Sequence, residues 1–360
     1  MRKKAYFKSV TIFLSILLVF SQLQLFSLPA YGETVSDQPL LFRSVGVAQN
    51  GTTYYVDGEG GNNANDGQSP ASAWRDFEKV NQTEFQPGDH LLLNAQSTWN
   101  NQLLHPKGNG TAAQKIVIDF YDTNDKGETI FETTRRPIIN GGGTYSTGTF
   151  KRAISGAVQL VNQEYWDISN LEVTNTPELD NLEGYKKPGD AQRAGILVLG
   201  YEQNRTFNSV TIRNNYVHDV QTEYYLNLSG NTATKRLKAV GGIIVLGSWF
   251  DENGNVVTAA NDHRTTTGFN DILIENNVIQ RVGLEGIRTK ADSDTSRGNT
   301  FYKTFSNITI RNNYLEDIAG DGIVLSESKS GGVVEGNVAV RMCNADYGTQ
   351  NYAGVWAMSV

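Results

Sequence analysis

The stretch "ITIRNNYLEDIAGDGIVL", residues 308–325, contains the pattern that determines the predicted fold. Apolar and polar residues alternate at its start, an asparagine pair follows, and a second apolar segment begins after Gly322. Alternation at period two is typical of a β-strand, and asparagine tolerates the left-handed backbone of a sharp bend. The stretch therefore predicts a strand, a bend and a second strand, with Ile308 and Ile310 facing the interior.

Related segments recur along the chain and indicate how a core is formed. The pattern returns in "FNSVTIRNNYVHDV" (207–220), "FNDILIENNVIQRV" (269–282) and "FSNITIRNNYLEDI" (305–318), with weaker copies at 166–175 and 333–342. One such unit cannot bury its apolar face alone, so repetition is typical of a solenoid. Units stacked at about 4.8 Å form continuous parallel sheets. We expect the asparagines at the bends to form a hydrogen-bonded ladder.

A second repeated element begins with glycine and continues as a short strand. It reads "GILVLG" from Gly195, "GIIVLG" from Gly242, "GIRTK" from Gly286, "GIVLS" from Gly322 and "GVWAM" from Gly354. The spacing of these glycines falls from 47 to 44, 36 and 32 residues, so the loops shorten while the strands keep their length. A β-sandwich or propeller would show hairpin signals and more regular periods. We therefore predict an all-β protein, a right-handed parallel β-helix.

The start of the chain has the features of an export signal. Four cations precede an apolar run at residues 10–20, and the small residues Ala30 and Gly32 follow. Residues 1–32 therefore predict a signal peptide and a secreted protein, with a linker at 33–52. We assign the N-terminal cap and first coils to 53–150, and the groove-lining coils to 151–360.

The charge and cysteine content exclude several classes of protein. The chain has 31 Lys and Arg against 38 Asp and Glu, and the signal segment holds four of the cations and no acid. The mature chain would therefore carry 27 basic and 38 acidic residues, a formal charge of −11, which does not suit nucleic acid. The single cysteine, Cys343, permits no disulfide framework or cysteine-based zinc site, and we interpret it as a small buried apolar residue. We expect a monomer that does not contact membrane after signal cleavage.

The N-terminal segments carry a resemblance to a known family. "TYYVDGEGGNNANDGQSPASAWRDFEKVN" (53–81), the following "FQPGDHLLLNAQSTWNNQLLHPKGNGTAAQKIVID" and "RPIINGGG" resemble the opening of secreted, pectin-lyase-like β-helix proteins that act on polysaccharides. The nearest resemblance is to bacterial β-helical glycoside hydrolases. It implies a short helix in "SAWRDFEKVN" that plugs the end of the solenoid, and Trp74, Phe77 and Val80 fall at helical spacing there.

The Gly-led strands are the expected wall of a polymer-binding groove, because the longest insertions flank them, at 221–241, 248–268 and 291–304. With the residue after each glycine facing inward, the outward columns are apolar in early coils and charged later. Glu285 and Asp321 would lie on adjacent coils, roughly 5 Å apart at the backbone. Glycoside hydrolysis uses such a pair of carboxyl groups, so we predict that both are catalytic. Their alternative role is that of solvated turn residues paired with Arg288.

Further candidates surround this pair. Arg288 and Lys290 share the outward face and are predicted to bind substrate. Asp346 lies in "MCNADYGTQNYAGVWAM" among aromatic residues, which stack on sugar rings, so it is a third catalytic candidate, or else a turn residue. The aromatic side chains expected to contact sugar are Tyr347, Trp356 and Trp249.

Two other functions fit the same pattern. In a lyase acting on a uronate polymer, Lys290 would abstract the proton next to the carboxyl group, and Ca²⁺ or an arginine would neutralise that carboxyl. Asp292 and Asp294 are the candidate calcium ligands of such a lyase, whereas the hydrolase needs no cofactor. A non-catalytic carbohydrate-binding β-helix would need no apposed acids. The preferred function is hydrolysis of an extracellular polysaccharide.

The last Gly-led strand, "VWAMSV", has no polar cap or covering helix after it. An uncapped coil exposes apolar side chains and unpaired backbone groups. We therefore expect the chain to be a fragment, with part of its active site on later coils.

Overall fold

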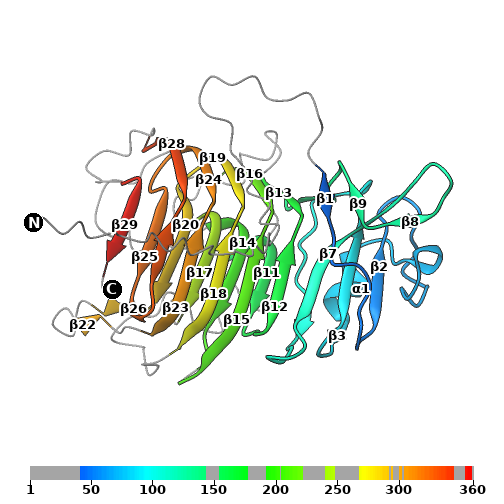
Figure 1. Ribbon diagram of the computed structural model, residues 1–360, viewed down its shortest axis with the longest axis horizontal. Helices are drawn as coiled ribbons and strands as arrows, with labels where there is room; N and C mark the ends of the chain where they lie inside the picture. Colours follow the sequence, from blue (N-terminus) through cyan, green and yellow to red (C-terminus); the bar gives the residue numbers. More distant parts are fainter. Residues whose placement is uncertain are drawn as a thin grey trace, which may run out of the picture. The chain divides into compact units, whose positions relative to one another are not determined.

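The repeated segments form stacked parallel strands in the computed structural model, as the sequence predicts. The structure describes residues 41–142, 154–176, 192–202, 204–221, 240–247, 267–291, 293–294, 300–301, 304–343 and 353–358. Within them, three larger sheets run side by side, and the chain passes from one sheet to the next before it returns one strand further along. Figure 1 shows this succession from β2 to β29. The parallel β-helix is thereby confirmed. In the described part of the chain, no helix has the length and apolar character needed to cross a bilayer.

The first strands of the strand–bend–strand units lie in a ten-stranded sheet, and the second strands lie in a seven-stranded sheet. The ten-stranded sheet follows the order β2 (Thr53–Val56), β4 (His90–Asn94), β7 (Ile116–Thr123), β12 (Trp166–Ser169), β15 (Thr206–Arg213), β18 (Gly268–Glu275), β23 (Phe305–Arg311) and β26 (Ser328–Ser330), with β27 (Val333–Glu335) also on β23 and β8 (Thr129–Ile130) on β7. The seven-stranded sheet contains β5 (Thr98–Asn100), β10 (Ile138–Asn140), β13 (Glu172–Asn175), β16 (Tyr216–Val220), β19 (Val278–Val282), β24 (Tyr314–Ile318) and β28 (Val338–Met342).

The Gly-led strands form the third, six-stranded sheet. Its strands are β11 (Ile154–Val161), β14 (Gln192–Gly200), β17 (Gly241–Gly247), β20 (Glu285–Ala291), β25 (Ile323–Ser326) and β29 (Val355–Met358). Strand β11 was not among the predicted Gly-led strands. Two-stranded pairs complete the described strands: β1 (Phe42–Arg43) with β9 (Glu132–Thr133), β3 (Glu84–Phe85) with β6 (Lys107–Gly108), and β21 (Ser293–Asp294) with β22 (Thr300–Phe301).

The leading glycines are required by the close approach of neighbouring coils. A Cβ atom added to Gly242 would lie 2.7 Å from the carbonyl oxygen of Gly286, and one added to Gly286 would lie 2.4 Å from that of Gly322. Real Cβ atoms do not come this close to backbone atoms, so glycine is needed here because the backbone of the next coil occupies the place of a Cβ. The same contact is present at Gly195 and Gly322.

The two asparagines of each bend have different structural roles. The first member has a left-handed backbone, with φ of 57°, 55° and 54° at Asn214, Asn276 and Asn312. The second member is buried and builds the expected ladder: the amides of Asn215, Asn277, Asn313 and Asn337 bond at 2.9–3.0 Å from coil to coil. Each of these side chains also donates to a backbone carbonyl of the preceding coil.

The interior columns are apolar and stacked. Phe207, Phe269 and Phe305 follow one another at ring-centroid distances of 5.4 and 5.9 Å. At the N-terminal end, helix α1 (Phe77–Gln82) begins after the N-cap Asp76 and buries Phe77 and Val80. The plugging helix is thereby confirmed but is shorter than expected, because Trp74 lies before it and bridges Val56. A 3₁₀ turn, Pro70–Ser72, precedes this segment.

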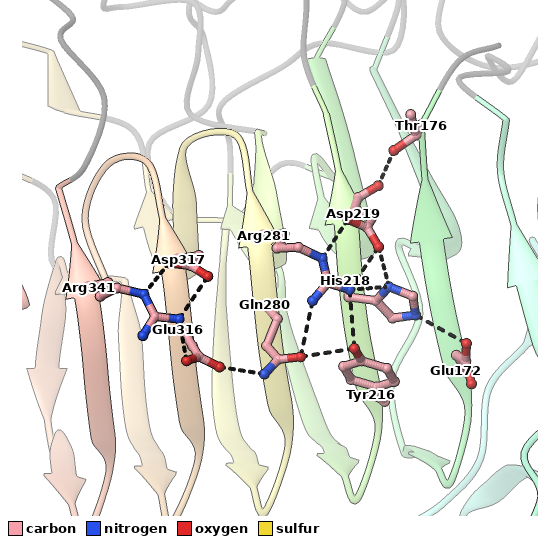
Figure 2. Close-up of polar contacts among 10 residues, drawn as sticks. All are labelled: Glu172, Thr176, Tyr216, His218, Asp219, Gln280, Arg281, Glu316, Asp317 and Arg341. Carbon is pink, nitrogen blue, oxygen red and sulfur yellow. Dashed lines mark hydrogen bonds and ion pairs between the residues drawn. The ribbon is translucent and has the colours of Figure 1, made fainter. Parts of the chain in front are cut away.

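The ion pairs between coils of the seven- and ten-stranded sheets have their acid and cation in the same order along the stack. The acid belongs to one coil and the cation to the following coil in Asp167–Arg213, Asp219–Arg281, Glu275–Arg311 and Asp317–Arg341. Figure 2 shows two of these pairs, together with His218, which contacts Glu172 on the preceding coil at 3.1 Å. Stacking like charges in register would be destabilising, and this offset avoids it.

We predict that removing one ladder amide destabilises the whole stack. Asn277→Ala leaves the Asn215 backbone N–H and the carbonyl of Ile212 without their buried partner. The expected loss is about 1–3 kcal/mol in the free energy of unfolding, measured by urea denaturation. As a control, Asn270→Ala removes two amide bonds, to Asn208 and Asn307, on the partly accessible outer face and should have a smaller effect. Equal losses for the two variants would contradict a special role for the ladder.

We also predict that His218 stabilises the protein in its protonated form. Burial lowers the pKa of His218, but hydrogen bonds to Glu172 and Asp219 outweigh it, so the pKa is raised above 6.5. The contribution should be complete below pH 6.5 and lost as the pH rises through the raised value. The difference in urea midpoint between the native protein and His218→Gln should therefore shrink as the pH is raised. A difference that stays constant would show no preference for the protonated form, and one that grows would show that the neutral form is preferred.

Candidate functional site

The six-stranded sheet has the outward columns that the sequence predicts. Strand pairing places Leu197 beside Ile244, Ile244 beside Arg288, Arg288 beside Val324, and Val324 beside Trp356. Leu246 pairs with Lys290 in the next column. The residue after each glycine faces the interior, where Ile196, Ile243, Ile287 and Ile323 are buried in the main core.

The early coils are apolar on both faces, as predicted. Their outward side chains form a second buried cluster of Ala194, Leu197, Leu199, Ile244 and Leu246, with Val161 and Tyr201 packed against it. The outer face becomes polar at β20 and at the entrance to β25. This change places the candidate site beside a buried apolar surface.

Glu285 and Asp321 lie on adjacent coils. The backbone N–H of Gly286 donates to the carbonyl of Asp321 at 2.9 Å, and the strands that follow pair Ile287 with Ile323. One carboxylate oxygen of Asp321 accepts the backbone N–H of Ala353 at 2.6 Å, so the next coil fixes its position. The predicted juxtaposition of the two acids in the stack is therefore present.

Both acids are buried, so the solvation expected in the alternative role is wrong, whereas its pairing of Glu285 with Arg288 is present. Glu285 is 3% exposed and Asp321 is 4% exposed. Glu285 forms an ion pair with Arg288, which is itself buried. Burying a charge without a partner is costly, so the guanidinium allows the carboxylate to lie here.

The lone cysteine lies beside this acidic pair. Cys343 has a left-handed backbone, with φ of 58°, and its N–H donates to the carbonyl of Gly320 at 3.2 Å. Burial, and then the negative charges of Asp321 and Glu285, raise the pKa of its thiol. The interpretation of Cys343 as a buried residue needs correction, since the side chain is only partly buried.

Lys290 is not an isolated cation on the groove wall. Its ammonium group forms an ion pair with Glu327, and both side chains are buried. Glu327 also accepts the backbone N–H of Ala291 at 3.3 Å and has a left-handed backbone, with φ of 54°. Glu327 was not among the predicted site residues, because its Gly-led strand was expected to end at Ser326. The acid that begins the polar run "ESKS" was the available signal.

The acid and the cation of this pair follow one another along the stack in the opposite order to the pairs on the other two sheets. Lys290 lies on the earlier coil and Glu327 on the later one, whereas the earlier coil supplies the acid elsewhere. In the described part of the stack, the candidate site therefore contains a buried ion pair whose cation, and not its acid, lies on the earlier coil.

Of the other predicted site residues, one is described by the structure and the rest are not. Trp356 lies on β29 and is 38% exposed, so its indole ring is accessible. Asp346, Tyr347 and Trp249 lie outside the described residues, as do Asp292 and the predicted signal segment. Where side chains are described, no group of three or more His, Cys, Asp or Glu could hold a metal ion. The calcium ligands of the lyase alternative therefore stay a prediction.

The chain is thus a parallel β-helix with buried carboxylates at the six-stranded sheet. No family model matches the sequence. The chain is similar to a lacto-N-biosidase from Bifidobacterium longum subsp. longum, with 27% identity over 359 aligned residues that take in 86% of this chain and 22% of the relative. The predicted resemblance to β-helical glycoside hydrolases is thereby confirmed.

Two solved structures share the fold. The native and selenomethionine crystal structures of a GH136 lacto-N-biosidase from Eubacterium ramulus superpose with TM-scores of 0.57 and 0.55, at 23% and 24% identity. The match covers 77% of this chain and 43% of those chains. The chain therefore spans less than half the length of these relatives.

We predict that breaking the buried Lys290–Glu327 pair is strongly destabilising. Glu327→Gln removes the charge but keeps the shape, so the buried Lys290–Glu327 ion pair is lost. The expected cost is about 3–5 kcal/mol in the free energy of unfolding, by urea denaturation. Lys290→Met combined with Glu327→Gln should recover part of this loss. Recovery of none of it, or a cost below that of the accessible Arg43–Glu132 pair in Glu132→Gln, would contradict the ion-pair explanation.

Proposed function

We propose that this chain forms the β-helical part of a glycoside hydrolase, with Glu285 and Asp321 as its pair of carboxyl groups. The observation that carries the proposal is the placement of these two acids on adjacent coils of one outer sheet face. The similarity to a lacto-N-biosidase supports the same reaction class. A hydrolase needs two neighbouring carboxyl groups, and the stacking of these two coils supports such a pair.

The contacts suggest a division of roles. Glu285 is held against the guanidinium of Arg288, so it is the proposed charged partner, which attacks the anomeric carbon or activates a water. Asp321 is the proposed acid, which donates a proton to the glycosidic oxygen as its bond to the anomeric carbon breaks. Ala353 orients Asp321 through one oxygen, so the other oxygen is the candidate proton donor. Trp356 would stack on a sugar ring next to the acids.

The substrate proposed first is a glycan that contains lacto-N-biose. The name of the Bifidobacterium relative indicates that sugar, and this chain covers 22% of that relative, so its specificity is a separate question. An extracellular glycan also fits the proposal of secretion, which the basic and apolar segments of residues 1–32 support. Recovery of a mature chain that starts near residue 33 from the culture medium would test export.

The ion pair of Lys290 favours hydrolysis over the lyase alternative. A lyase base must accept a proton from substrate, whereas the ammonium of Lys290 is buried against Glu327. The hydrolase requires no rearrangement of that pair. A lyase product would carry a double bond that absorbs ultraviolet light, and we expect no such product.

We predict that Glu285→Gln and Asp321→Asn each lower kcat on an aryl lacto-N-bioside by about 10²–10⁴-fold. The measurement is release of the aryl alcohol, with the melting temperature recorded for each variant. Glu275→Gln is the matched control, because it removes the same group from an ion pair on the ten-stranded sheet. It should leave kcat unchanged within about twofold.

Two results would contradict the proposal. The first is native turnover in a folded Glu285→Gln protein, which would make the pair with Arg288 a structural ion pair. The second is saturable glycan binding without product release, which would identify a carbohydrate-binding β-helix instead.

A further inference from the structure

One outward column of the six-stranded sheet carries a buried N–H donor at two of its positions. Strand pairing stacks Gln159 of β11, Leu197 of β14, Ile244 of β17 and Arg288 of β20 in that order. Gln159 faces outward because side chains alternate along a strand and its neighbours on both sides, Val158 and Leu160, lie in the main core. We call the four stacked residues the Gln159–Arg288 column.

Each donor side chain of this column has one polar atom fixed by the chain and another that is unused. The side-chain oxygen of Gln159 accepts the backbone N–H of Gly156 at 3.1 Å, and Nη1 of Arg288 donates to Glu285. In the part of the chain that the structure describes, Nε2 of Gln159 and Nε of Arg288 have no acceptor. Gln159 is 1% exposed and Arg288 is 3% exposed. A buried donor without an acceptor is unfavourable, so an acceptor on a ligand would be stabilising at both positions.

The middle of the column is apolar and its charge is balanced. Leu197 and Ile244 belong to the buried apolar cluster of this sheet face. An apolar surface between fixed hydrogen-bond donors fits an oligosaccharide, whose rings have C–H faces and whose oxygens accept hydrogen bonds. Arg288 is paired with Glu285, so an uncharged sugar fits this column better than an acidic one.

The two donors are separated by the length of a short sugar chain. Gln159 and Arg288 are three coils apart, which is about 14 Å at the usual spacing of neighbouring strands. A sugar unit in an extended glycan is about as long as one such spacing. Arg288 contacts Glu285, so a glycan on this column would extend from the candidate acids across β17 and β14 toward β11.

We propose that the Gln159–Arg288 column binds uncharged sugar units of the substrate beyond the bond that is cleaved, with Gln159 as the residue that determines specificity for chain length. The inference rests on the proposed function, which places the cleaved bond at Glu285. Arg288 donates from Nε to an oxygen of the nearest unit and Gln159 donates from Nε2 to an oxygen of the farthest. Both donors are buried, so binding includes a local rearrangement, and association should be slower than about 10⁵ M⁻¹s⁻¹.

The test measures ligand binding to the full chain by isothermal titration calorimetry. The ligands are lacto-N-biose and the same disaccharide lengthened by one, two or three uncharged sugar units at either end, with sulfur in the linkages so that they are not cleaved. Affinity should rise with length at one of the two ends. Gln159→Glu keeps the acceptor for Gly156 but removes the donor, so it should bind the longest ligand about tenfold more weakly. Its affinity for lacto-N-biose should stay within about twofold of the native value.

Two further variants make this result specific. Gln159→Leu removes the amide without adding a charge and should give the same loss for the longest ligand. Gln163→Leu is the control, because Gln163 is also buried but its amide nitrogen already donates to the carbonyl of Pro106 at 2.8 Å. It should bind the whole series like the native chain, and the melting temperature is recorded for each variant.

The outcomes separate this inference from the proposed reaction. Affinity that does not rise with ligand length would overturn the inference, as would equal losses for short and long ligands in both Gln159 variants. Length-dependent binding that requires Gln159, without turnover of the oxygen-linked ligands, would support the column and reject the hydrolase.

Discussion

The hydrogen-bonded register between neighbouring coils is the constraint on which the rest of the structure depends. In a parallel stack each residue has as neighbours the equivalent residues of the coils above and below it. The same side chain must therefore be acceptable beside its own kind, as phenylalanine and asparagine are in their columns. Glycine at the head of each Gly-led strand is the strictest case, because the next coil occupies the place of its Cβ.

Side chains of like charge repel one another when they stack in register. The sheets differ in where their ion pairs lie. In the ion pairs that are offset by one coil on the other two sheets, the cation is partly accessible, so such a pair costs little and contributes little. On the six-stranded sheet, Glu285, Arg288, Lys290 and Glu327 are buried, so each charge depends on its partner. These buried ion pairs are one reason why we propose that the chemistry lies on this sheet.

The periodic features were predictable and the non-periodic ones were not. Repetition revealed the strands, the bends, the outward column from Leu197 to Trp356 and the adjacency of Glu285 to Asp321. The burial of these acids was not predictable, since a strand pattern does not specify what covers its outer face. Glu327 was missed because a left-handed residue after the strand depends on contacts with β20 that no local pattern encodes. Trp74 was assigned to a helix because its spacing matched, although pairing with Val56 holds it extended.

A cross-link across the site sheet tests the central claim, that the register brings the coil of Glu285 onto the coil of Asp321. Arg288 and Val324 are paired residues on β20 and β25, and backbones at this spacing fit a disulfide. In a Cys343→Ser background, Arg288→Cys with Val324→Cys should form an intramolecular disulfide under mild oxidation, whereas Arg288→Cys with Ser326→Cys should form far less. Efficient closure of the second pair, or none of the first, would contradict the register and the site built on it.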